Sequence, residues 1–123
     1  MQRMRPKPGR VFLTPQGEGW VYDRMPGFRF EWLLQTDRFE MLLVTVEPSA
    51  ETGTMVHEGE EGHYVLEGEL EIAVEGETHR LRPGDAFWHE SGRAHRWRNP
   101  TGVVVRVVSI AVPRTSVSRM IGE

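Results

Sequence analysis

Apolar and polar residues alternate over short runs of this chain, which is the pattern of half-buried β-strands. In one such run the aromatic residues Phe28, Phe30 and Trp32 fall on one face, and Arg29 and Glu31 fall on the other. The run predicts a strand that turns an aromatic face towards the interior.

A second strand is predicted from Phe39 to Val46, because this stretch is dense in strand-forming residues. It stops before Pro48, whose nitrogen cannot donate to a sheet ladder. Further short strands are expected over residues 86–89, 95–98 and 103–112.

A β-hairpin is predicted after Tyr64. The apolar residues Leu70, Ile72 and Val74 share one face of its first strand, and the opposite face is a solvated row formed by Glu69, Glu71 and Glu75. Glu75 and Gly76 suit a tight turn, and the return strand through His79 and Leu81 ends at the turn Pro83-Gly84-Asp85. His79 is expected to be a half-exposed strand residue.

No segment of useful length carries the period of a helix, so the chain is expected to be all-β, a sandwich or barrel. With 123 residues it has room for one domain. We expect a flexible arm over residues 1–10, flanking strands over 11–36, the barrel over 37–112 and a tail over 113–123.

Composition narrows the function classes. Fifteen Lys and Arg against 18 Asp and Glu give a formal net charge of −3, which argues against a surface that coats nucleic acid. There is no Cys, so any metal must be held by nitrogen and oxygen ligands. No stretch is apolar and long enough for a membrane span or a signal peptide, and a cytoplasmic protein is expected.

The segment from Thr54 to Gly68 concentrates the residues that carry chemistry. Within its predicted strand, Glu61, His63 and Val65 project to the same side, because side chains alternate with period two. Since Val65 is apolar, that side is expected to be the interior. A carboxylate and an imidazole are costly to bury unless they are paired or bound to a metal.

A second segment places His95 and Trp97 on one face and Arg96 and Arg98 on the other. The arginines favour water, so His95 is expected to point inward. Imidazole and carboxylate ligands without sulfur suit a divalent ion such as Zn, Fe, Mn, Ni or Cu. Trp88 and His89 are neighbours at a strand end, so one of them must face outward, where a rim or dimer-contact role is as plausible as a ligand role.

These residues resemble the cupin family, whose first motif contains His-X-His, a Glu three or four residues on, and a Gly after six more. His57, Glu61 and Gly68 match the second His, the Glu and the Gly. The second motif, a Gly-Asp turn followed by a His and an Asn, is matched by Gly84-Asp85, His95 and Asn99. The resemblance implies a double-stranded β-helix, or jelly-roll barrel, covering residues 39–112.

The resemblance also implies a metal site, although the position of the first histidine is Met55 here. His57, Glu61 and His95 then form a three-ligand site, and His63 is a candidate fourth ligand or a hydrogen-bonding pocket histidine. A metal-free pocket that uses the same polar groups is the alternative. The predicted pocket residues are Trp97, Met55, Trp32 and Met41.

The sequence is similar to the sensor cupins of helix-turn-helix regulators, which implies a small-molecule-binding protein whose ligand is an organic acid. The alternative is a metal-dependent cupin enzyme, a dioxygenase, isomerase or lyase. Tyr64 and His63 are the candidates for proton transfer in it, and Tyr64 is disfavoured because strand parity turns it away from Glu61. Cupins commonly dimerise through N-terminal strands, so a homodimer is expected, with the Phe28–Trp32 region as the contact.

Overall fold

The computed structural model describes residues 11–113, and over this range all the regular structure is β-strand. The predicted arm at 1–10 and nearly all of the predicted tail lie outside the described residues. The nine strands are β1 (Trp20–Tyr22), β2 (Phe28–Gln35), β3 (Glu40–Val46), β4 (Glu60–Glu67), β5 (Leu70–Val74), β6 (Glu77–Leu81), β7 (Ala86–Glu90), β8 (His95–Arg98) and β9 (Val105–Val112). The described part of the chain contains no helix that could span a bilayer.

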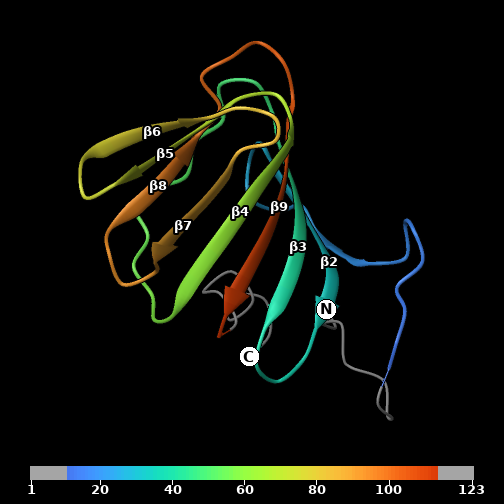
Figure 1. Cartoon of the computed structure of the whole chain (residues 1–123). Coiled ribbons are helices and arrows are strands. Elements are labelled where there is room, and N and C mark those ends of the chain that lie inside the picture. The colour runs from blue at the N-terminus through green and yellow to red at the C-terminus, as the bar shows by residue number, and fades with distance from the viewer. Residues whose placement is uncertain (1–10, 114–123) are drawn as a thin grey trace.

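The strands form two antiparallel sheets, as expected for a cupin-type jelly roll. The larger sheet has the order β1-β2-β3-β9-β4-β7 and the smaller one the order β6-β5-β8. Figure 1 shows β6, β5 and β8 together on one side, with β7, β4, β9, β3 and β2 fanning out on the other. The all-β prediction is therefore confirmed.

Most strand boundaries match the sequence pattern, and two do not. The aromatic strand continues beyond Trp32 to Gln35, because a register shift between Trp32 and Leu34 lets the chain keep pairing after the alternation is lost. Flanking strands were expected over residues 11–36, but the short strand β1 carries no alternating signal and was not located individually. It forms by pairing with β2, where Trp20 lies opposite Trp32.

The hairpin between β5 and β6 has the predicted turn. Glu75 and Gly76 both have positive φ, 49° and 83°, which is the backbone that a two-residue hairpin of this hand requires. Leu70 and Ile72 are fully buried and Val74 is partly buried, so the apolar face of β5 lies against the core.

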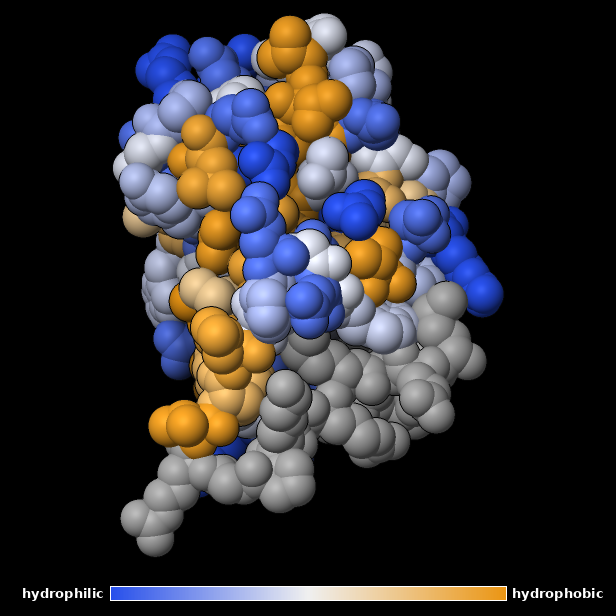
Figure 2. Space-filling view, turned by 90° about the vertical axis from the view of Figure 1, so that its right-hand side faces the viewer, coloured by the Kyte–Doolittle hydropathy of each residue, from blue (hydrophilic) through white to orange (hydrophobic). Residues whose placement is uncertain are grey.

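The core lies between the two sheets and is apolar at one end and polar at the other. Phe28, Phe30, Leu42, Val44 and Val107 belong to its apolar part. Buried polar side chains gather further along the same inner faces; they include Glu61, His63, His89, His95 and Ser109. Figure 2 shows the outside of the molecule, where apolar patches are interrupted by polar residues.

Candidate metal centre

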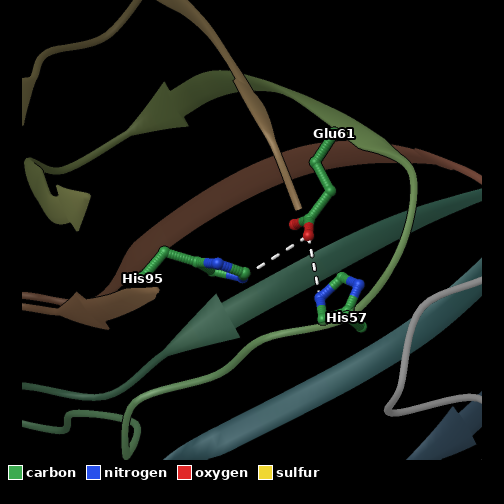
Figure 3. A group of neighbouring side chains, drawn as sticks. All are labelled: His57, Glu61 and His95. Atoms are coloured by element: carbon green, nitrogen blue, oxygen red, sulfur yellow. Dashed lines mark ion pairs between the residues drawn. The ribbon is translucent and has the colours of Figure 1, made fainter. Parts of the chain in front are cut away.

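Three side chains from separate segments meet inside the fold. His57 lies in the loop before β4, Glu61 near the start of β4, and His95 at the start of β8. The Nε2 atom of His57 lies 2.9 Å from Oε2 of Glu61, and Nε2 of His95 lies 3.5 Å from the same oxygen. Figure 3 shows the carboxylate of Glu61 between the two imidazoles. The donor atoms are close enough together to hold one metal ion.

Local backbone pairing fixes the loop that carries His57. Met55 forms an isolated antiparallel bridge with His95, with hydrogen bonds of 2.8 Å and 3.0 Å between their main chains. Two residues further on, the amide of His57 donates to the carbonyl of Ser91 at 3.0 Å. The loop is thus joined to β8 on one side and to the end of β7 on the other, which brings His57 to Glu61.

The imidazole of His95 is oriented as a metal ligand would be. Its Nδ1 atom lies 2.7 Å from the carbonyl oxygen of Arg93, and because a carbonyl only accepts, Nδ1 carries the proton. The lone pair of Nε2 then points to Glu61, and this buried nitrogen has no hydrogen-bond partner among the described residues. A buried acceptor without a donor fits a site built for a cation.

Glu61 is held as a carboxylate. Burial by itself would raise its pKa, but hydrogen bonds with His57 and His63, the electrostatic attraction of His63, and a 2.8 Å hydrogen bond from the Ser91 hydroxyl outweigh that cost. Together they hold the pKa of Glu61 well below its usual range. The group is therefore an anionic ligand at any pH at which the protein functions.

His63 faces the interior, but it lies beside the other oxygen of Glu61. Its Nε2 atom is 3.4 Å from Oε1, and its Nδ1 is 2.7 Å from the hydroxyl of Ser109, the residue opposite it on β9. The structure groups His63 with His89 and not with His57 and His95.

His89 is the buried polar residue that the sequence pattern left open. It is the inward-facing member of the pair, 4% exposed, whereas Trp88 is 59% exposed. β7 pairs with β4 so that His89 lies directly opposite Glu61. Burial lowers the pKa of His89, although its bond to the carbonyl of Glu90 and the charge of Glu61 oppose the shift. Only the strand register brings this residue to the site.

A cavity that opens to solvent lies against these polar groups. His57, Glu61, His63 and Ser109 line it at one end. The rest of its wall is mainly apolar and consists of Met25, Phe28, Phe30, Leu42, Val44, Thr52, Met55 and Trp97.

The predicted pocket residues divide into two groups. Trp97 and Met55 line the cavity, and the buried Nε1 of Trp97 has no hydrogen-bond partner within the described range. Trp32 and Met41 do not line it, contrary to the expectation. Met41 lies on the opposite face of β3 from Leu42, and Trp32 is packed under Trp20 with its Nε1 bonded to Glu40 at 3.1 Å.

The outward-facing residues behave as the alternation predicts. Tyr64 is 48% exposed and points away from Glu61. His79 is half-exposed, 3.2 Å from Glu77, and its ring contacts Phe87 outside the metal centre.

Comparison with known proteins agrees with this architecture. The family model described as "Cupin domain" matches residues 42–111. The chain is 32% identical over 76 residues to the HTH-type transcriptional regulator PuuR of Escherichia coli (strain K12), a match that covers 61% of this chain. It spans only 41% of that regulator's length.

Two solved structures illustrate the likeness in fold. KdgF from a Halomonas species superposes with a TM-score of 0.78 at 24% identity, covering 89% of this chain and 99% of the other. The Cupin_2 domain of an XRE family transcriptional regulator from Enterobacter cloacae has a TM-score of 0.66 at 24% identity, covering 69% of this chain and 95% of that domain.

Proposed function

This chain belongs to the cupin family, and from that premise we propose that it binds a small organic acid at a divalent-metal centre formed by His57, Glu61 and His95. The observation that carries the proposal is that two members of this triad, His57 and Glu61, lie at the polar end of a mainly apolar cavity. The donor set fits a transition ion, because two imidazoles and one carboxylate suit Zn, Fe, Mn, Ni or Cu.

The cavity supports an anionic ligand with an apolar part. One carboxylate does not neutralise a divalent ion, so the bound ion would leave a positive centre that favours an anion in its open positions. When bound, the ion supplies a Lewis acid that polarises the ligand's oxygen atoms. The indole Nε1 of Trp97 offers a further hydrogen-bond donor, and Phe28, Phe30 and Leu42 would pack against the apolar part of the ligand.

A sensing role is supported by the regulator relatives. PuuR, which is similar to this chain over 76 residues, is by its name a transcriptional regulator. We infer that this chain reports the presence of its ligand through the occupancy of the cavity. We also infer that it does not bind nucleic acid by itself, since its formal net charge is −3.

The test combines metal analysis with a thermal-shift screen. Purified protein is expected to contain near one divalent ion per chain, and small organic acids are expected to raise Tm only while the ion is present. At a hundredfold excess over Kd, a ligand stabilises the fold by about 2.7 kcal/mol. His95→Ala removes one ligand of this centre and is expected to abolish the metal-dependent ligand response. His79→Ala, at a histidine outside the cavity, is expected to leave both the metal content and the ligand response unchanged.

The outcomes separate the alternatives. Ligand stabilisation that persists in chelator identifies a metal-free pocket that uses the same polar groups. The proposal is refuted if the wild-type protein contains no metal and shows no thermal response to any ligand.

An enzymatic role is the second candidate, and one observation favours it. Three donors leave coordination positions open, and two of the three, His57 and Glu61, line the cavity. Sites with open positions are the ones that carry out metal-assisted reactions. Product formation or oxygen uptake with an acid that binds, lost in Glu61→Gln, would establish this role; stoichiometric binding without turnover establishes the sensor.

The homodimer remains a proposal, and its contact surface has to differ from the predicted one. The aromatic side chains of Phe28, Phe30 and Trp32 are buried in the core and are not available to a partner. Light scattering of the purified protein tests the state, with twice the 14.1 kDa chain mass expected.

A further inference from the structure

The carboxylate of Glu61 faces a different pair of histidines with each of its oxygens. Oε2 faces His57 and His95, as described above. Oε1 lies 3.4 Å from Nε2 of His63 and 3.8 Å from Nε2 of His89. We propose that Glu61, His63 and His89 form a second divalent-cation position at Oε1 of the carboxylate. It adjoins the first centre, since the ring centroids of His89 and His95 are 4.5 Å apart.

The spacing of the second triad suits a metal without rearrangement. The Nε2 atoms of His63 and His89 are 3.3 Å apart, so the three donor-to-donor distances are 3.3, 3.4 and 3.8 Å. With metal–ligand bonds of about 2.0–2.2 Å, tetrahedral coordination places neighbouring donors about 3.3–3.6 Å apart. The separations in the protein lie at or near that range.

Both histidines are held by their other ring nitrogen. Nδ1 of His89 donates to the carbonyl of Glu90 at 3.0 Å, which leaves the lone pair of Nε2 facing Glu61. Nδ1 of His63 lies 2.7 Å from the hydroxyl of Ser109, which can accept its proton. Hydrogen bonds of this kind orient metal-binding histidines and fix their tautomer.

The simpler interpretation is a hydrogen-bonded pair without metal. In it, Nε2 of His63 carries a proton and donates to Nε2 of His89 across 3.3 Å. Metal binding requires that proton to leave Nε2, with Nδ1 of His63 donating to Ser109. The same geometry supports both states, so direct binding measurements must distinguish them.

One ion at a time occupies the two positions. Two divalent ions that share a single carboxylate among neutral imidazoles would leave a large net positive charge in a buried site. The second position is therefore an alternative to the first, and it stands independently of the function proposed above.

The test is a titration of four proteins with Co²⁺, in which the visible absorption of the bound ion is measured. The proteins are the wild type, His57→Ala/His95→Ala, His63→Ala/His89→Ala, and the variant with all four changes. We expect the first double variant to bind near one Co²⁺ per chain, with an absorption band shifted from that of the second double variant, and the quadruple variant to lose binding. Phe replacements provide a second set, which keeps a ring in each place in case the alanine variants fail to fold.

Each result assigns the two sites separately. If His57→Ala/His95→Ala loses Co²⁺ while His63→Ala/His89→Ala retains it, the second position is refuted and the first centre stands. If only His57→Ala/His95→Ala binds, the second position is the metal site and the first centre is refuted. If neither double variant nor the wild type binds, both are refuted.

Discussion

Asn99 lies in the second sequence motif, yet its side chain contacts none of the proposed metal ligands. It is fully buried, and its Nδ2 donates to the carbonyls of Val46, Glu47 and Val103 at 3.1, 3.1 and 2.8 Å. Its Oδ1 accepts from the amide and hydroxyl of Thr101 at 2.9 and 2.7 Å. One side chain thus joins the end of β3 to the loop before β9.

Replacing Asn99 with Ala should destabilise the fold without altering the metal site. The two hydrogens of Nδ2, shared among three carbonyls, count as two hydrogen bonds, and Oδ1 accepts two more. At about 0.5–1.5 kcal/mol for each of the four, their loss lowers the free energy of unfolding by about 4 kcal/mol. For a domain of this size, that lowers Tm by about 16 °C or more.

Urea unfolding in chelator, followed by tryptophan fluorescence, measures the free energy of unfolding. Thr101→Val removes one donated and one accepted hydrogen bond of a single hydroxyl and serves as the control, with a loss of about 2 kcal/mol expected. If Asn99→Ala lowers the free energy of unfolding by less than about 1 kcal/mol, or if the folded variant has a changed metal content, the hydrogen bonds of Asn99 are not what stabilises these loops.

Three further predictions follow from the site and its turns. Met55→His should raise metal affinity by about tenfold or more, because residue 55 lines the cavity and pairs with His95; an unchanged affinity in a competition titration contradicts this. Burial lowers the pKa of His89 from 6.5, so that as pH falls the unfolded chain takes up a proton before the folded chain does. The metal-free fold should therefore lose stability as pH falls below about 6.5 towards the lowered pKa. His89→Phe should flatten this pH dependence of the free energy of unfolding in urea, and an unchanged slope would disprove it. Gly68→Ala should lower the free energy of unfolding by about 2 kcal/mol or more. Gly68 has φ of 79°, and a Cβ there would lie 2.7 Å from the carbonyl oxygen of Val104. Gly76→Ala is the control: its Cβ would meet no neighbour, so it should cost less in the same assay.

The alternation of side chains was enough to predict most of the strands and the inward-facing residues of β4 and β8. On β4, Glu61 and His63 share the inward face with the apolar Val65. On β8, His95 and Trp97 face inward and alternate with the exposed Arg96 and Arg98. Turn residues such as Glu75-Gly76 located the hairpin for the same local reason.

Other features depend on strand pairing, which no local pattern specifies. His89 reaches the site only because β7 pairs with β4 in a register that places it opposite Glu61. Trp32 and Met41 were assigned to the pocket from residue type, but Met41 lies on the outer face of β3 and the ring of Trp32 packs against Trp20. The short β1 exists only through its pairing with β2.

The ligands of the first centre come from both sheets, and this has a mechanical consequence. Glu61 belongs to the large sheet, His95 to the small one, and His57 to the loop that bridges to β8. A cation shared by these groups would act as a cross-link between two layers that otherwise meet through apolar packing. Occupancy would then stiffen β8 and its neighbour β5, and slower amide exchange in these strands would report it. A change at the pocket could in this way be transmitted to the outer surface of the small sheet, where a partner could detect it.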